Sequence, residues 1–171
     1  MTLGVVSAEE IERLRPQLRE LVRDCVEDGA SIGFVLPLAD DVLDTYLSQV
    51  RDEVGRGTRI VVVAGDGELV DGMVHLALVP WPNAPHRAEL QKLLVHTRAR
   101  RRGLATRLME EAERAAREHG RTLLVLDTIT GTDAYGLYRK LGWSEVGEIP
   151  GYAGWPSGEL APTTIFFKRL V

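Results

Sequence analysis

Residues 90–120 read LQKLLVHTRARRRGLATRLMEEAERAAREHG, and this stretch decides the fold. Its first residues are mostly apolar and fit a buried strand that ends near His96. An arginine-rich turn leads from there into a predicted helix over residues 103–119, whose apolar positions recur at spacings of three and four. Gly120 is a typical stop signal for this helix. The stretch therefore predicts a strand that passes directly into a helix.

A second strand is predicted over residues 123–128, which begin with the apolar run LLVL. A strand, a helix and another strand in succession indicate a parallel pair joined by a right-handed crossover. Further downstream, the pattern predicts a short helix over residues 132–141 and a strand that runs from Trp143 into a turn-rich segment. A last strand is expected over residues 163–170.

The segments before the decisive stretch add helices and a hairpin. Ser7, with Glu10 three residues later, forms a capping-box pattern that starts a helix reaching about Asp28. Pro16 lacks an amide donor, so it is expected to kink or divide this helix. The other predicted segments are a strand (3–6), an ordered apolar loop (29–38), a helix (40–55), a hairpin (58–64 with 69–79) and a strand (88–96).

The composition restricts the class of protein. A length of 171 residues, with 44% hydrophobic and 27% charged residues, indicates one globular domain over residues 1–171. The net charge of −4 gives no general attraction to nucleic acid. One cysteine, Cys25, can form neither an intramolecular disulfide nor a cysteine-based zinc site, and the four histidines are scattered, so no metal is expected. No run is apolar enough for a membrane span and no secretion signal begins the chain, which favours the cytoplasm.

The arginine-rich turn has the properties of an anion site. The first turn of a helix has unpaired amides and a positive dipole end, and a glycine such as Gly103 lets the backbone approach a phosphate closely. Arginines add fork-shaped donors for phosphate oxygens. A solvated basic turn is the alternative, but its place between a strand and a helix favours an anion site.

Two motifs carry a resemblance to a known superfamily. The R-x-x-G-x-A pattern of Arg100, Gly103 and Ala105 resembles the pyrophosphate loop of the GNAT acyltransferases, which bind acetyl coenzyme A (acetyl-CoA). The segment LYRKLGW at 137–143 resembles the tyrosine and Gly-aromatic helix end of the same superfamily. The resemblance covers nearly all of the chain and implies a mixed, α+β-like α/β fold: a twisted, splayed central sheet of six to seven strands flanked by about four helices. Segments 28–34, 123–131 and 151–170 further resemble the tabtoxin-resistance acetyltransferase subgroup.

The resemblance also implies roles for individual residues. Backbone groups of Leu93, Leu94 and Val95 would pair with the pantetheine arm of acetyl-CoA, and Tyr138 would protonate the departing thiolate. Many members have an asparagine about seven residues before the tyrosine, whereas this chain has Gly131, so its tyrosine helix is expected to contact coenzyme A differently. The pyrophosphate would be held by the turn formed by Arg100, Arg101, Arg102, Gly103, Leu104, Ala105 and Thr106.

An amine must lose a proton before it can attack a thioester, because free alkylamines are largely protonated near neutral pH. Glu89, at the start of the acyl-binding strand, and Asp127, at the end of the neighbouring strand, are the candidate carboxylates that orient the amine and relay its proton. The alternative is that Glu89 is a solvated edge charge and Asp127 caps a loop. Phe34 and Tyr152 are candidates for the acceptor site, Tyr152 as part of a loop that acts as a lid.

Together these features predict direct transfer of an acetyl group from acetyl-CoA to a small-molecule amine, such as a metabolite, a dipeptide toxin or an antibiotic. Acetylation of protein N-termini or lysines is the first alternative, and an open acceptor groove would favour it. A non-catalytic sensor of acyl-CoA and a nucleic-acid module are the others. Nucleic-acid and membrane partners are not expected, and the resemblance allows a homodimer.

Overall fold

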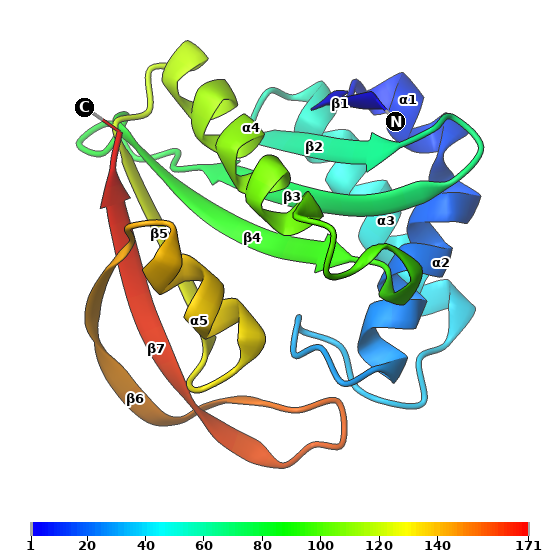
Figure 1. The fold of residues 1–171 in the computed structure, drawn as a ribbon. Coiled ribbons are helices and arrows are strands. Elements are labelled where there is room, and N and C mark those ends of the chain that lie inside the picture. Colours follow the sequence, from blue (N-terminus) through cyan, green and yellow to red (C-terminus); the bar gives the residue numbers. More distant parts are fainter. Residues whose placement is uncertain (1, 171) are drawn as a thin grey trace.

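The computed structural model describes residues 2–170, so the terminal residues 1 and 171 of the expected domain lie outside the described part. The described chain forms five α-helices, one short 3-10 helix and seven strands (Figure 1). In chain order these are β1 (Thr2–Val5), α1 (Ala8–Arg13), α2 (Arg15–Glu27), α3 (Asp40–Gly55), β2 (Arg59–Gly65), β3 (Val70–Leu78), β4 (Arg87–Val95), η1 (Thr97–Ala99), α4 (Leu104–Glu118), β5 (Leu123–Ile129), α5 (Asp133–Lys140), β6 (Ser144–Gly154) and β7 (Leu160–Arg169).

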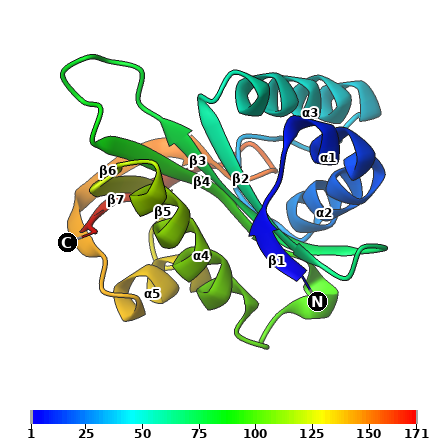
Figure 2. The ribbon, with the colours of Figure 1, turned by 90° about the horizontal axis from the view of Figure 1, so that it is seen from above.

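The seven strands form one mixed sheet in the order β1-β2-β3-β4-β5-β7-β6, with helices on both faces. Helices α1, α2 and α3 cover one face, and α4 and α5 cover the other (Figure 2). Each face has its own apolar core, with Leu21 and Leu43 fully buried in the first and Leu108 and Phe166 in the second. The expected mixed α/β fold is confirmed. No helix among residues 2–170 is both long and apolar enough to cross a bilayer.

The N-terminal helices begin and divide as the sequence predicts. The Ser7 hydroxyl accepts a hydrogen bond from the Glu10 amide at 3.2 Å, and the Glu10 carboxylate accepts one from the Ser7 amide at 2.8 Å, which completes the capping box. Pro16 lies in the first turn of α2, where its missing amide donor costs nothing. The chain therefore breaks at Leu14 into α1 and α2, and this division brings the number of helices to five.

The sheet is continuous up to β4 and then separates. Strands β1 to β4 pair antiparallel, whereas β4 and β5 pair in parallel, as the crossover through α4 predicts. This parallel pairing covers only Arg87 to Glu89 of β4. Beyond these residues the two strands diverge, and a V-shaped gap opens between them (Figure 1). The sheet resumes where β5 pairs antiparallel with β7, and β7 with β6.

A bulge interrupts β4 beside the gap. Met73 lies opposite Leu94 and His75 opposite Gln91, so two residues of β4 oppose a single residue of β3. Lys92 lies in this bulge with a left-handed φ of 53°, which is rare outside glycine. The bulge bends β4 and changes the face to which its side chains point.

The C-terminal strands are longer than the sequence predicts. The sequence predicts a strand from Trp143 that soon enters turns, and the structure continues this strand as β6 through Gly154, with two register shifts. Strand β7 begins at Leu160, three residues before the expected start at Thr163. Tyr152 therefore lies in a strand rather than in a lid loop, and the turn of this segment is confined to residues 155–159 between β6 and β7.

Candidate active site

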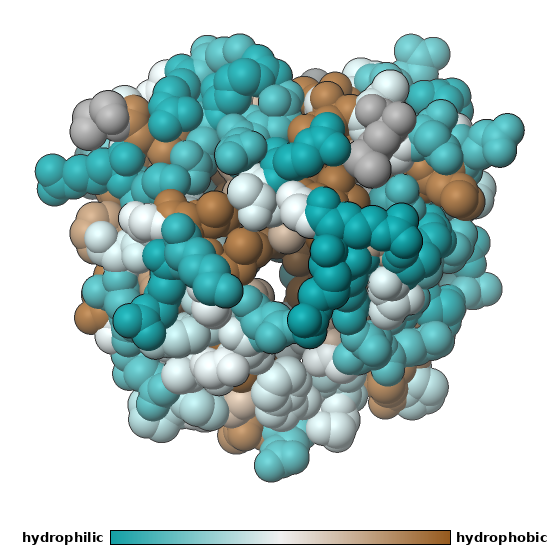
Figure 3. Space-filling model, viewed as in Figure 1, coloured by the Kyte–Doolittle hydropathy of each residue, from teal (hydrophilic) through white to brown (hydrophobic). Residues whose placement is uncertain are grey.

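A cavity lies at the gap between β4 and β5. Its volume is about 630 Å³, and its walls come from both strands, the loop after α2, the start of α4, and α5. The space-filling view shows it as the hollow in the middle of the face (Figure 3). The cavity exists because the two strands separate after only three paired residues, so that no side chain of a neighbouring strand fills the space.

One wall of this cavity is the edge of β4. Leu93, Leu94 and Val95 all line it, and from Leu90 onward this edge has no partner strand within residues 2–170. The Leu94 side chain is buried beneath the helices of the opposite face, so Leu94 offers the cavity its backbone. The Val95 carbonyl is occupied, because it accepts a hydrogen bond from Arg100 Nε at 3.0 Å. An unpaired strand edge can accept an extended ligand as though it were another strand.

The arginine-rich turn places the start of α4 at the end of the cavity. Gly103 caps the helix with a left-handed φ of 76°, and no side chain bonds to the first amides. The first intrahelical bond of the turn runs from Arg107 N to Gly103 O at 3.2 Å, which leaves the amides of Leu104, Ala105 and Thr106 without a helical partner. Ala105 also lines the cavity. This is the geometry of an anion-binding helix N-terminus.

The three arginines of the turn differ in their contacts. Arg101 and Arg102 are exposed, and Arg101 makes only a 3.8 Å contact with Asp133. The Arg100 side chain points back from the turn, where it contacts Asp28 of the α2 end and the carbonyl of Val95. Arg100 therefore connects β4 to α2 as well as lining the cavity.

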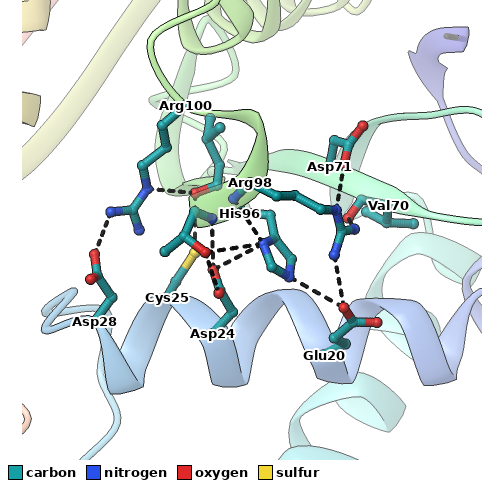
Figure 4. Close-up of polar contacts among 11 residues, drawn as sticks. Glu20, Asp24, Cys25, Asp28, Val70, Asp71, His96, Arg98 and Arg100 are labelled. Carbon is teal, nitrogen blue, oxygen red and sulfur yellow. Dashed lines mark hydrogen bonds and ion pairs between the residues drawn. The ribbon is translucent and has the colours of Figure 1, made fainter.

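A polar network fixes the turn before α4 onto helix α2 (Figure 4). The ring of His96 contacts Glu20 at 3.2 Å and Asp24 at 3.3 Å. Arg98 contacts Glu20 at 2.8 Å and Asp71 at 2.9 Å. These residues come from three distant segments of the chain, so no local sequence pattern reveals the network. It anchors the end of β4 and the following turn to α2 and to the start of β3.

Tyr138 of α5 and Asp127 of β5 face the same cavity. Tyr138 is 5% exposed and packs against Trp143 and Phe166, while its hydroxyl has no hydrogen-bond partner within residues 2–170. Burial, reinforced by the nearby Asp127 carboxylate, raises the pKa of the Tyr138 phenol far above its usual range. Burial also raises the pKa of Asp127, although the Lys92 ammonium opposes this shift. The phenol therefore stays protonated at neutral pH.

Glu89 lies elsewhere. It is the last residue of β4 that pairs with β5, opposite Val125, and its side chain is exposed and does not line the cavity. The structure thus brings Tyr138 and Asp127 together and places Glu89 outside their cavity. Lys92 also lines this cavity, although no sequence motif points to it.

A model of the acetyltransferase (GNAT) family matches residues 12–143, which is most of the chain. The chain belongs to the GNAT acetyltransferase family. Three solved structures share its fold. A ribosomal-protein-alanine N-acetyltransferase from Brucella melitensis has a TM-score of 0.80 at 22% identity, with 99% of each chain covered. A protein from Salmonella typhimurium, described as an acetyltransferase with its cofactor acetyl-CoA, has a TM-score of 0.80 at 18% identity, covering 100% of this chain and 94% of that one. An aminoglycoside 6'-acetyltransferase type Ii has a TM-score of 0.72 at 23% identity, with 100% and 98% covered.

Two loops of this GNAT chain meet over the cavity. The Ser31 hydroxyl donates a hydrogen bond to the Gly154 carbonyl at 2.6 Å, and the Leu36 amide donates one to the Pro156 carbonyl at 2.9 Å. Ser31 belongs to the loop between α2 and α3, and Gly154 ends β6, so segments more than 100 residues apart meet at the cavity, and we call their contact its roof. Trp155 lines the cavity from this roof.

The predicted acceptor residues separate in the GNAT fold. Phe34 lines a second cavity, which adjoins the first. Tyr152 is 54% exposed on β6 and lines neither of these two cavities. Trp81, another aromatic residue outside the core, is 64% exposed in the loop between β3 and β4, at a separate hollow. No three His, Cys, Asp or Glu side chains gather as metal ligands within residues 2–170.

Proposed function

We propose that the protein transfers the acetyl group of acetyl-CoA directly to the amine of a small molecule, with both substrates bound at once. The observation that carries this proposal is the roof over the cavity, where the Ser31 and Leu36 contacts join two loops across the site. A roof over the space left beside the cofactor suits a small acceptor, whereas a folded protein's N-terminus or a lysine in a peptide needs an open groove.

The arrangement supports a defined place for acetyl-CoA. The pantetheine arm would extend along the unpaired edge of β4 at Leu93 to Val95, and the pyrophosphate would accept hydrogen bonds from the free amides at the start of α4. Arg101 and Arg102 are exposed beside these amides and would add charge to the phosphate site. Arg100 would act mainly by holding the turn in place through Asp28.

The side chains of the cavity account for the proton balance of a direct transfer. The neutral amine attacks the thioester carbonyl carbon, so that a C–N bond forms and the C–S bond breaks. Asp127 would accept a proton from the incoming ammonium group and pass it to solvent, because its raised pKa brings it nearer to that of a working base. Tyr138 would give its proton to the departing thiolate and regain one from the nitrogen of the product, directly or through water.

An acetyl-enzyme intermediate has little support here. Cys25 lines the cavity, but burial raises the pKa of its thiol to about 11, so it is protonated at neutral pH and a poor nucleophile. Its sulfur also lies 3.6 Å from the Val95 carbonyl, to which it donates. Direct transfer from acetyl-CoA is the simpler route.

Of the two candidate carboxylates, Asp127 has the better position, because it lines the cavity with Tyr138. Glu89 remains in the proposal as a second carboxylate that acts on the site electrostatically from outside the cavity, since its charge opposes the lowering of the pKa of Lys92. The proposed acceptor is in keeping with the resemblance to the tabtoxin-resistance subgroup, in which toxin or antibiotic resistance would be the biological role.

The experiment is release of free coenzyme A thiol from acetyl-CoA, with a panel of small amines beside a panel of N-terminal peptides. We expect turnover with small amines and none with peptides. Turnover with peptides alone would overturn the small-molecule assignment in favour of protein acetylation. Tight acetyl-CoA binding with no turnover on either panel would favour a sensor of acyl-CoA.

A further inference from the structure

A second cavity of about 500 Å³ adjoins the proposed acetyl-transfer site. It shares Ile32, Gly33, Gln91 and Lys92 with the first cavity, so the two are side by side and meet at the bulge of β4. Phe34 of the loop and Tyr46 of α3 form part of its wall. An acceptor whose amine reaches the thioester from this side would place the rest of its structure in the second cavity.

The base of this cavity is polar, although the surrounding face of the sheet is apolar. His75 of β3 lies opposite Gln91 of β4, and Arg59 of β2 lies two residues along, opposite Ala77, so the three form a polar row that crosses neighbouring strands diagonally. Arg59 Nη1 contacts His75 Nδ1 at 3.3 Å and donates to Gln91 Oε1 at 3.0 Å. The bulge adds Lys92 beside them, and its ammonium lies 5.9 Å from the centre of the Phe34 ring. Burying such a row costs free energy unless its groups are paired.

Several donors in this row have no partner within residues 2–170. Lys92 Nζ donates to the Ile32 carbonyl alone, although an ammonium group has three hydrogens. The Arg59 side chain is 14% exposed and pairs with Glu53 through Nε, but its Nη2 makes no hydrogen bond. The Tyr46 hydroxyl and His75 Nε2 are buried without any partner in the same layer. The site therefore has an excess of donors.

The pKa shifts in this row agree with an excess of positive charge and of hydrogen-bond donors. Lys92 and Arg59 repel each other, and this repulsion, together with burial, lowers the pKa of Lys92. The same two cations and burial lower the pKa of His75 well below its usual range, so its ring is neutral. The opposing charges are Glu53, which is paired with Arg59, and Asp127 and Glu89 on the side of the first cavity. Asp41 adds a further carboxylate at the exposed rim.

We propose that the second cavity, formed around Arg59 and Lys92, binds a carboxylate group of the acceptor, so that the substrate is an amino acid or a similar small amine bearing a carboxylate. This inference rests on the proposed acetyl transfer to a small amine. A carboxylate has only acceptor oxygens, which match the unused donors of Arg59 and Lys92, and its charge relieves the repulsion between them. A polycationic amine would add to that repulsion.

The same arrangement assists the reaction. Lys92 lies between the two cavities, so an amine held next to its carboxylate would lie near this cation and near Asp127. A neighbouring positive charge disfavours the ammonium form of the substrate and favours the neutral amine that attacks. Lys92 is thus a specificity residue that contacts the carboxylate and also prepares the nucleophile.

The test compares amino acids with their carboxamides as acceptors in the thiol-release assay. Lys92→Met keeps the length of the side chain and removes its charge, and Lys140→Met makes the same change at an exposed residue of α5 far from the row. We expect the wild-type protein to favour the acids, and Lys92→Met to lower kcat/KM for the acids by about 10- to 100-fold more than that for the amides, because both lose the charge beside the amine but only the acids lose the carboxylate contact. Lys140→Met should leave both unchanged. The change in the acid-to-amide ratio from the wild type to Lys92→Met cancels the difference in amine basicity between the two acceptors and any general loss of structure.

The wild-type comparison, with each kcat/KM divided by the fraction of neutral amine at the assay pH, decides the inference even if Lys92→Met does not fold. A preference for carboxamides or for polycationic amines would overturn it and leave the acetyl-transfer proposal intact. If no amine is acetylated although acetyl-CoA binds, the acetyl-transfer proposal fails separately. Calorimetric titration of the same acids and amides into the coenzyme A complex then tests the cavity itself: tighter binding of the acids supports the carboxylate site, and equal or absent binding overturns it.

Discussion

Replacing Tyr138 by phenylalanine is expected to lower activity without lowering stability. The phenol ring packs against Trp143 at a centroid distance of 5.9 Å and against Phe166 at 6.0 Å, and phenylalanine keeps both contacts. Only the hydroxyl is lost, and it forms no hydrogen bond within residues 2–170. A hydroxyl that is largely desolvated and unpaired stabilises nothing in the folded state.

The magnitudes follow from these contacts. Removing an unpaired, mostly buried hydroxyl should change the free energy of unfolding by between zero and about +1 kcal/mol, which corresponds to a rise in Tm of up to about 4 °C for a chain of this size. General acid catalysis contributes about 100-fold or more to a rate, so kcat should fall by at least that factor. The KM for acetyl-CoA should not change, because the proposed contacts of the pyrophosphate are made by backbone amides at the start of α4.

The assay is thiol release with the best acceptor, combined with thermal unfolding of the same samples. Tyr135→Phe is the matched control, since Tyr135 lies on the same helix. Its hydroxyl donates a hydrogen bond to Glu145 Oε2 at 3.0 Å on the surface. This control should lose about 0.5 kcal/mol of stability and keep its activity. If Tyr138→Phe retains more than about a third of the wild-type kcat, Tyr138 is not the acid and its place at the cavity is structural.

Three other predictions follow from the site and the fold. Asp127→Asn should lower kcat/KM by about 100-fold and remove the decline in activity on the acid side, because the base is lost when the pH falls through the raised pKa of Asp127; a pH–rate profile measures this. Gly103→Ala has room for its methyl group but requires a left-handed φ, so it should cost about 1 kcal/mol of stability and weaken acetyl-CoA binding in a calorimetric titration. Gly72→Ala would place a Cβ 2.9 Å from a carbonyl oxygen of β4 and should lower the free energy of unfolding by about 2 kcal/mol in urea, whereas Gly4→Ala, which meets no atom within 4 Å, should be neutral.

The helical half of the fold can be predicted because its signals are local. Ser7 and Glu10 determine where α1 starts, Pro16 determines where the helix divides, and the spacing of Leu104 and Leu108 determines the buried face of α4. Each of these signals acts within one or two helical turns. The parallel pairing of β4 and β5 could also be predicted, because chain order and handedness leave few alternatives.

The β-structure at the C-terminus was harder to predict because register is a long-range property. Glycines and Pro150 suggested turns near Tyr152, yet two register shifts let β6 continue past them along β7. The polar row of Arg59, His75 and Gln91 is hidden for the same reason: the residues are separated in the sequence and meet only through the pairing of three strands. Lys92 looked like an ordinary strand residue, since the bulge that redirects it leaves no local pattern.

The geometry of the arginine-rich turn could be predicted from the sequence only in part. The sequence predicted a glycine-capped helix start after a strand, and the structure has this geometry at Gly103. It did not predict that Arg100 turns back to Asp28, because the acidic face of α2 meets the turn only in the folded chain. A cluster of like charges can be recognised in a sequence, whereas the ion-pair partner of each charged side chain cannot.

A crystal structure of the protein with acetyl-CoA is the most direct test of the proposed cofactor site and of the role of Tyr138. We predict that the pantetheine arm extends along the unpaired edge of β4, that the pyrophosphate lies on the amides of residues 104–106, and that the thioester sulfur comes within hydrogen-bond distance of the Tyr138 hydroxyl. A cofactor bound outside the gap between β4 and β5, or a sulfur atom on the side of the sheet away from Tyr138, would contradict the account.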